Sequence, residues 1–160
     1  LIDLWAKLRQ PGSVFFDITW CGFAGATPPD RYHHIFEVVC AARDAAVDFV
    51  RRRFETGQGC FGYEVDDATR NVVAAAGFGD FFVHRTGHSI GQQVHGNGAN
   101  IDNLETCDNR RLVPGLCFSI EPGIYLPGEM AVRTEINVFI RPGNQVEVTG
   151  DIQKSLICLT

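Results

Sequence analysis

The sequence predicts a single α+β domain, and three observations support this class. Strand-like segments open the chain, helix-like segments follow them, and strand-like segments return afterwards. This grouping of strands and helices is typical of α+β folds. The length of 160 residues corresponds to one domain, and 45% hydrophobic with 21% charged residues is the composition of a globular protein.

Residues 1–25 predict two strands joined by a turn at Pro11–Gly12. Side chains alternate between the two faces of a strand, so Phe15, Asp17 and Thr19 share one face of the second strand. This face combines a carboxylate with apolar neighbours.

Two helices are predicted next. The first begins near Asp30, which suits an N-cap or a first turn, and apolar residues recur at spacings of three and four as far as Phe54. Glycines in residues 55–62 end this helix. The second helix runs from about Val65 to Ala76. The arginines at 51–53 predict a solvated helix end rather than a nucleic-acid patch.

The remaining elements are mostly strands. Residues 80–91 are predicted to be extended with glycine interruptions, and residues 98–111 form a polar loop. Residues 112–128 predict two strands separated by a Pro-Gly break. Residues 131–150 predict a hairpin that turns at RPGN, and residues 155–159 predict a last strand.

Charge and cysteine content exclude several classes of protein. The net charge of −5 argues against a nucleic-acid partner. None of the six cysteines forms a C-x-x-C pair, so a structural zinc site is not expected. Buried free thiols fit a reducing environment, so we expect a cytoplasmic protein. No apolar run approaches the roughly 20 residues of a membrane helix, and no signal peptide is visible.

Four carboxylates lie among apolar residues: Asp3, Asp17, Glu121 and Glu135, the last in the middle of a predicted strand. A buried carboxylate costs several kcal/mol unless it is paired or bound to a cation. A salt bridge is the simpler explanation for any one of them. Four together, with few cationic neighbours, indicate a shared explanation, which a pair of metal ions would supply.

Three histidines lie close together, at His84, His88 and His95. The H-x-x-x-H spacing is that of a zincin helix, but Arg85 replaces the glutamate of that motif and nearby glycines disfavour a helix. On a strand, His84 and His88 would lie roughly 13 Å apart and could not bind the same ion. We therefore expect one of them to be a ligand while the others line the site.

The segments HRTGHSIG, FSIEPGIY and VRTEINV, preceded by LIDLWAK and FFDITW, resemble successive signatures of the M24 metallopeptidases. The resemblance covers almost the whole chain and implies the pita-bread fold, a curved, mostly antiparallel sheet with helices outside. It implies five metal ligands: Asp3, Asp17, His88, Glu121 and Glu135. His84, His95 and Arg133 match positions that support the ligands or contact the substrate.

A histidine stands four positions before the ligand histidine, which resembles Xaa-Pro aminopeptidases and prolidases and is unlike typical methionine aminopeptidases. Of these, the function we expect is that of a Xaa-Pro aminopeptidase. Such an enzyme cleaves the bond preceding proline in a peptide, using two divalent ions. Oxygen-rich ligands favour Mn²⁺, with Co²⁺, Fe²⁺ or Zn²⁺ as alternatives. The rival hypotheses are a prolidase that acts on dipeptides and a non-catalytic binding module. A zincin protease is disfavoured by Arg85.

Within such a centre, Asp17 and Glu135 would bridge the two ions, and Glu121 would also shuttle a proton to the leaving amine. His84 or His95 would donate a hydrogen bond to the substrate carbonyl or the developing oxyanion.

Arg133 and Tyr125 have open alternatives. Arg133 shares a strand face with Glu135, so it would orient this carboxylate, pair with a substrate carboxylate, or form a structural ion pair. Tyr125 either lines the pocket or packs in the core.

The chain also departs from the family pattern. Asp3 and Asp17 are more widely spaced than usual, and Gly96 replaces a frequent glutamate. The chain begins almost at the first ligand, so we expect residues 1–160 to be one catalytic domain that lacks the upstream part usual in the family. Weak activity and exposed apolar surface would follow, favouring a partner or a homo-oligomer.

Overall fold

The computed structural model describes residues 1–160 and confirms the α+β class. Ten strands, two α-helices and one 3-10 helix follow one another along the chain. Their order is β1 (Ile2–Ala6), β2 (Phe16–Trp20), β3 (Gly22–Ala24), α1 (Asp30–Glu55), α2 (Gly62–Ala75), η1 (Gly79–Phe81), β4 (Ser89–Ile90), β5 (Cys117–Ile120), β6 (Gly123–Leu126), β7 (Met130–Arg133), β8 (Ile136–Ile140), β9 (Val146–Thr149) and β10 (Ile157–Leu159).

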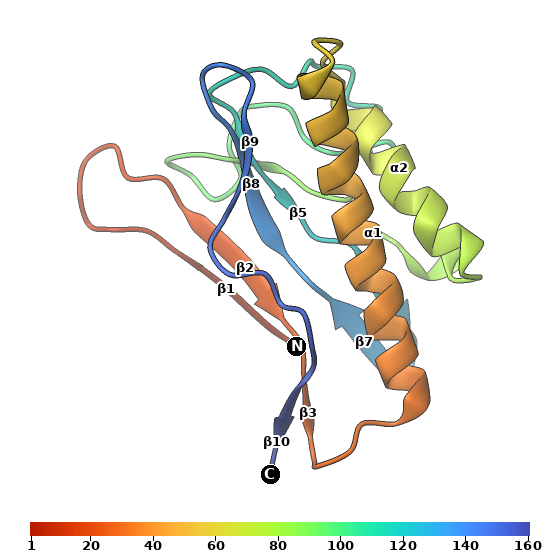
Figure 1. Cartoon of the computed structure of the whole chain (residues 1–160). Helices are drawn as coiled ribbons and strands as arrows, with labels where there is room; N and C mark the ends of the chain where they lie inside the picture. Colours follow the sequence, from red (N-terminus) through yellow and green to blue (C-terminus); the bar gives the residue numbers. More distant parts are fainter.

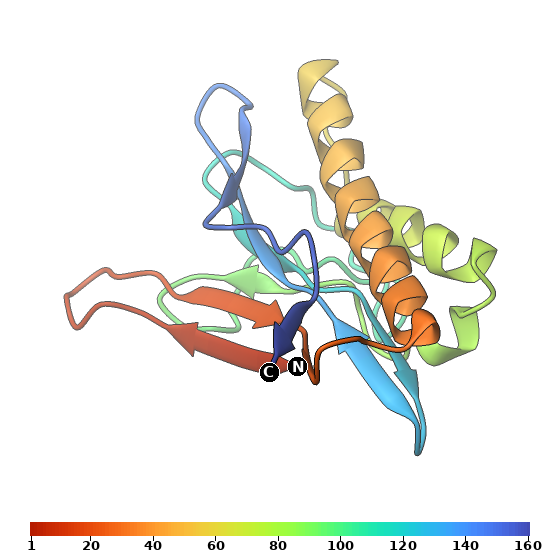
Figure 2. The same ribbon diagram turned by 60° about the horizontal axis from the view of Figure 1, so that its bottom comes forward.

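Strands β1 and β2 form the predicted antiparallel ribbon, with Asp3 opposite Thr19 and Trp5 opposite Asp17. The ribbon lies on the side of the sheet away from the helices, and its turn projects from the molecule (Figures 1 and 2). Its outer part exposes large apolar side chains, including Trp5 and Leu8. The inner strand, in contrast, buries Asp17 and Thr19 against the body of the protein.

The central sheet is antiparallel with the strand order β4-β5-β8-β9, and β6 pairs with β7 in a separate hairpin. The hairpin between β8 and β9 confirms the predicted turn at RPGN. The prediction that Glu135 lies mid-strand is wrong, because β7 ends at Arg133 and β8 begins at Ile136. In this break the Glu135 N–H donates to the carbonyl of Thr19 in β2. The chain therefore passes at Glu135, a predicted metal ligand, from β7, which pairs with β6, to β8, which pairs with β5.

Both helices cover one face of the sheet and lie beside each other (Figure 1). The predicted periodicity is confirmed, because Ile35, Val39, Ala42 and Val50 of α1 are completely buried. Asp30 occupies the first turn of α1 and Pro29 is the N-cap. Neither helix is long and apolar enough to pass through a membrane.

Helix α2 begins at Gly62, three positions before the predicted start. A Cβ atom at this position would lie only 1.8 Å from the carbonyl oxygen of Asn100, so the close approach of helix and loop requires glycine. Glu64 accepts a hydrogen bond from the Phe61 N–H and caps the helix start.

The segment 80–91 was predicted to be extended, but only Ser89 and Ile90 form a strand. The 3-10 turn η1 occupies its beginning, and Gly87 makes a single bridge to Ile101. Most of this histidine-bearing segment therefore depends on hydrogen bonds outside any sheet ladder.

All six cysteines are free. The prediction of buried thiols is confirmed for Cys21 and Cys60. Cys40 and Cys117, which lie in the apolar runs, are only half-buried, and the prediction is wrong for Cys107 and Cys158, which are exposed.

Candidate functional site

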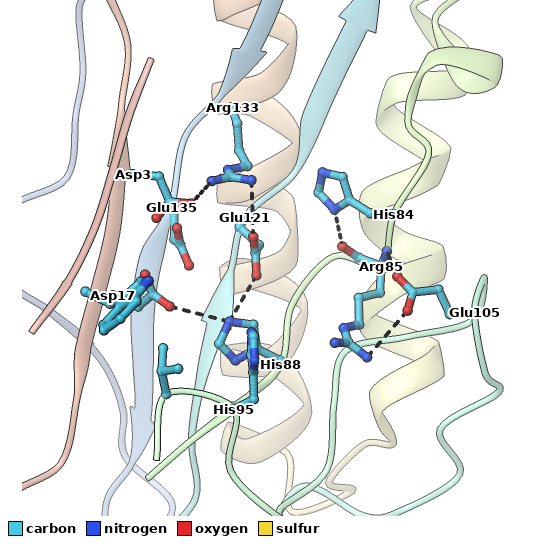
Figure 3. A pocket seen from close by; sticks show the side chains of 12 residues that line it. Asp3, Asp17, His84, Arg85, His88, His95, Glu105, Glu121, Arg133 and Glu135 are labelled. Carbon is cyan, nitrogen blue, oxygen red and sulfur yellow. Dashed lines mark hydrogen bonds and ion pairs between the residues drawn. The ribbon is translucent and has the colours of Figure 1, made fainter. Parts of the chain in front are cut away.

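A cavity of about 380 Å³ lies between the β1–β2 ribbon, the central sheet and the histidine segment (Figure 3). Only Trp5 and Val94 among its twelve lining residues are hydrophobic. The polar lining comprises Asp3, Asp17, His84, Arg85, His88, His95, Glu105, Glu121, Arg133 and Glu135. All five predicted metal ligands therefore face one cavity, together with both predicted accessory histidines.

Three of these side chains are close enough to share an ion. Ligand atoms of Asp17, His88 and Glu135 lie within 4.8 Å of one another, and all three residues are buried. Oδ1 of Asp17 and Oε1 of Glu135 are buried without any hydrogen-bond partner. Buried polar atoms are rarely left unpaired in folded proteins, so these two oxygens fit a cation.

His88 is oriented as a metal-binding histidine would be. Its Nδ1 donates to the Ser89 carbonyl over 3.1 Å, which leaves the lone pair of Nε2 free. Nε2 lies 3.5 Å from an Asp17 oxygen and 3.4 Å from a Glu121 oxygen. The imidazole therefore points its free nitrogen at two carboxylates.

Asp17 and Glu135 are held by side chains from the opposite strand. The Asn137 amide accepts from the Asp17 N–H over 2.9 Å and donates to the Asp17 carbonyl over 2.6 Å. The Thr19 hydroxyl donates to Oε2 of Glu135 over 2.7 Å. Asn137 of β8 thereby fixes the backbone of Asp17, and Thr19 of β2 fixes the carboxylate of Glu135.

Glu121 follows β5 and is anchored by two contacts. Its N–H donates to the Thr86 carbonyl over 2.7 Å, and the Ser119 hydroxyl donates to its Oε1 over 3.0 Å. Its Oε2 lies 4.0 Å from Arg133. Glu121 is therefore positioned between the histidine segment and β7.

Asp3 lies in the same cavity, but its carboxylate is exposed and pairs with Arg133. Its predicted role as a ligand therefore remains a prediction. Arg133 also donates from Nε to the Thr19 hydroxyl over 3.2 Å. Because Thr19 in turn donates to Glu135, Arg133 acts on this carboxylate through the threonine.

The site carries more negative charge than its own cations neutralise. Burial raises the pKa of Glu135 to about 9, and the charges of Glu121 and Asp17 contribute in the same direction. Burial also raises the pKa of Glu121. For His88, burial opposes protonation, but the carboxylates of Asp17 and Glu121 outweigh it and raise its pKa. Added positive charge would restore the ionised carboxylates.

His84 is engaged on both sides of its ring. Nδ1 donates to the Arg85 carbonyl over 2.7 Å, so Nε2 accepts from the Tyr125 hydroxyl, also over 2.7 Å. The predicted hydrogen bond from His84 to a substrate carbonyl would therefore have to displace one of these partners. Tyr125 itself does not line the cavity, and it contacts His84, a residue that does.

His95 stands next to the proposed ligand histidine. The rings of His88 and His95 meet edge to face, with their centroids 4.3 Å apart. Burial and the neighbouring His88 lower the pKa of His95, so it is neutral at neutral pH. His95 lines the cavity (Figure 3), and its contact with a substrate stays a prediction.

Sequence reasoning missed three polar supports of the site: Thr19 and Ser119, which donate to carboxylates, and Asn137, which bonds the backbone of Asp17. A signal for two of them was present, because Thr19 follows Asp17 at the two-residue period of a strand, and Asn137 follows Glu135 at the same spacing. Ser119 required knowledge of the contact between β5 and the histidine segment.

Comparisons with known proteins agree with this geometry. The profile of metallopeptidase family M24 matches residues 1–142. An Xaa-Pro dipeptidase from Lactobacillus helveticus is 38% identical over 112 residues, which are 70% of this chain and 28% of the relative.

Solved structures are similar over nearly the whole chain. Dipeptidase PepE from Mycobacterium ulcerans has a TM-score of 0.83 and 33% identity, covering 98% of this chain and 38% of its own. An Xaa-Pro dipeptidase from Bacillus anthracis has a TM-score of 0.75 and 29% identity, with coverages of 92% and 40%. X-Pro aminopeptidase from Thermotoga maritima has a TM-score of 0.76 and 25% identity, with coverages of 92% and 42%. The chain thus spans less than half the length of these relatives, and these likenesses support the predicted pita-bread fold.

Proposed function

Because the chain belongs to metallopeptidase family M24, we propose that it supplies the metal-binding site of an enzyme that hydrolyses Xaa-Pro peptide bonds. The observation that carries this proposal is the buried trio of Asp17, His88 and Glu135, whose ligand atoms lie within 4.8 Å of one another. The family implies divalent ions as cofactors. We propose two Mn²⁺ ions, since carboxylate and imidazole donors suit this metal, with Asp3 and Glu121 completing the ligands.

We propose an Xaa-Pro dipeptide as the preferred substrate. Relatives named Xaa-Pro dipeptidase support this choice over the aminopeptidase that the sequence motifs ranked first. The similarity to an X-Pro aminopeptidase keeps longer peptides as the second candidate.

Bound divalent ions would polarise the scissile carbonyl and make water a strong nucleophile at neutral pH. The protein's own residues hold the reacting groups. Asn137 fixes the backbone of Asp17, and Thr19 holds the carboxylate of Glu135, which limits how far these groups would reorganise during the reaction. His95, neutral at neutral pH, can donate a hydrogen bond to the substrate carbonyl.

Glu121 is suited to proton transfer. Burial raises the pKa of Glu121, which favours its protonated form and suits a group that takes up and passes on a proton. Ser119 engages Oε1, so Oε2 is the oxygen that would pass a proton to the leaving amine. Arg133, 4.0 Å from Oε2, would stabilise the carboxylate that remains.

The test combines metal content with substrate choice. We expect the protein to retain Mn²⁺ after gel filtration and to release proline from an Xaa-Pro dipeptide faster than from a Xaa-Pro tripeptide. A dipeptide without proline serves as the substrate control. Glu135→Ala should lose both metal and activity, while His33→Ala, on the exposed part of α1, should keep both. Failure to retain any divalent ion, or equal hydrolysis with and without proline, would contradict the proposal.

A further inference from the structure

An ion pair outside the cavity joins the buried Asp66 to the partly buried Arg70, one turn later on α2. Arg70 Nε donates to Oδ2 of Asp66 over 2.7 Å, and Asp66 is fully buried. Neither residue lines the cavity. Burying a carboxylate is unfavourable unless additional hydrogen bonds satisfy it, so the further partners of this pair indicate its role.

Asp66 binds the backbone of two loops. Its Oδ1 accepts the Thr86 N–H over 2.9 Å, and its Oδ2 accepts the Asn103 N–H over 2.8 Å. The carboxylate therefore joins α2 to the histidine segment and to the loop that follows it.

Arg70 binds the same segment at two more points. Nη1 donates to the Phe82 carbonyl over 3.0 Å, and Nη2 donates to the His84 carbonyl. The guanidinium carbon also lies 4.3 Å from the centre of the Phe82 ring. Three nitrogens of one planar group thus serve three acceptors, which the single ammonium of lysine cannot reproduce.

The anchored segment forms no strand between Phe82 and His88. Besides the bonds to Asp66 and Arg70, its backbone is held by the bridge between Gly87 and Ile101. Thr86 lies at its centre and connects two parts of the protein. Its N–H is bound by Asp66, while its carbonyl accepts the Glu121 N–H over 2.7 Å. A shift of this residue would move Glu121 with it.

The ring of His84 depends on the same anchors. It meets the Phe82 ring edge to face at 5.3 Å and contacts Tyr125 through Nε2. We propose that Asp66 and Arg70 are positioning residues that set the placement of His84 and Glu121 in the cavity. The catalytic importance of this role rests on the proposed function.

The test replaces Arg70 by lysine, which keeps the charge beside Asp66 and removes the planar fork. We expect the imidazole ¹H–¹⁵N signals of His84 in the metal-free protein to shift and broaden, because its carbonyl and its Phe82 neighbour lose their anchor. The kcat/KM for an Xaa-Pro dipeptide should fall about 10-fold or more, as is typical when a supporting partner of an active site is lost.

Arg53→Lys is the matched control. Arg53 also pairs with a carboxylate of α2, Glu64, over 2.6 Å and is partly buried, but it makes no hydrogen bond to the histidine segment. This variant should leave the His84 signals and kcat/KM unchanged.

Asp66→Asn provides a second variant if Arg70→Lys does not fold. It preserves size, but its amide nitrogen would face either the Thr86 N–H or the donors of Asn103 and Arg70, so the same His84 signals should shift. Unchanged His84 signals in the folded variants, with only a lower melting temperature, would overturn the proposal and leave a purely structural pair. The NMR result decides this point even if the wild-type protein cleaves no Xaa-Pro peptide, in which case only the proposed function fails.

Discussion

The exchange of Glu135 for glutamine should stabilise the metal-free protein. Burial and neighbouring carboxylates raise the pKa of Glu135 from 4.5 to about 9, so the folded state binds a proton that the unfolded chain has released. Between these two pH values the free energy of unfolding therefore falls as the pH rises. At about 1.36 kcal/mol per pH unit, the loss at pH 7 is about 3 kcal/mol. Glutamine carries no such proton and can still accept the Thr19 hydrogen bond.

The assay is thermal unfolding followed by circular dichroism in the presence of a chelator. At pH 7, Glu135→Gln should melt roughly 6–12 °C above the wild type, since 1 kcal/mol corresponds to about 2–4 °C at this size. The two proteins should converge near pH 4.5, where the unfolded glutamate also binds its proton. Saturating Mn²⁺ should reverse the order, because only the wild type has the negative ligand. A variant no more stable than the wild type at pH 7, or stabilised equally by Mn²⁺, would refute the assignment of Glu135.

Three further predictions address other parts of the site and fold. Thr19→Val should lower the free energy of unfolding by about 1–3 kcal/mol, measured by urea titration, because Glu135 and Arg133 lose a buried hydrogen-bond partner. Gly87→Ala should destabilise the protein by about 1–3 kcal/mol or more and reduce Mn²⁺ binding, since the new Cβ would lie 2.0 Å from a backbone oxygen of β5. At pH 8, Cys107 should react with a thiol reagent while Cys60 stays protected, because burial raises the pKa of Cys60 to about 12.

Matched variants give these experiments their controls. Thr56→Val removes an exposed hydroxyl at the end of α1 and should change the free energy of unfolding much less than Thr19→Val. A Cβ atom at Gly91 meets no atom within 4 Å, so Gly91→Ala should keep Mn²⁺ binding. Equal effects in the paired variants would contradict the structural explanation, as would equal labelling of Cys60 and Cys107.

The sequence predicted most elements because their periodicity reflects burial. The helix from Asp30 buries the apolar residues that recur at the helical period, and it was located correctly. The ribbon was located by its two-residue alternation, although the face that it buries carries the polar residues Asp17 and Thr19. Glu135 was misplaced because the break before β8 depends on its bond to Thr19, a contact between distant residues. The irregular segment before His88 could not be predicted for the same reason.

The site shows a similar division between local and distant information. The ordered motifs identified the carboxylates and histidines that line the cavity. They did not reveal that both ring nitrogens of His84 are engaged, or that Arg133 reaches Glu135 through Thr19. These details depend on side-chain geometry across elements, which motif spacing does not encode.

The three candidate ligands whose atoms lie near one another come from three separated parts of the chain, at positions 17, 88 and 135. Their convergence requires long chain segments to close before any ion can be bound, and such distant contacts form late in folding. A metal ion at this site would therefore contribute little to the folding transition state. It should slow the rate of unfolding while leaving the rate of folding almost unchanged. Metal loading would then protect the protein kinetically, by lengthening the lifetime of the native state.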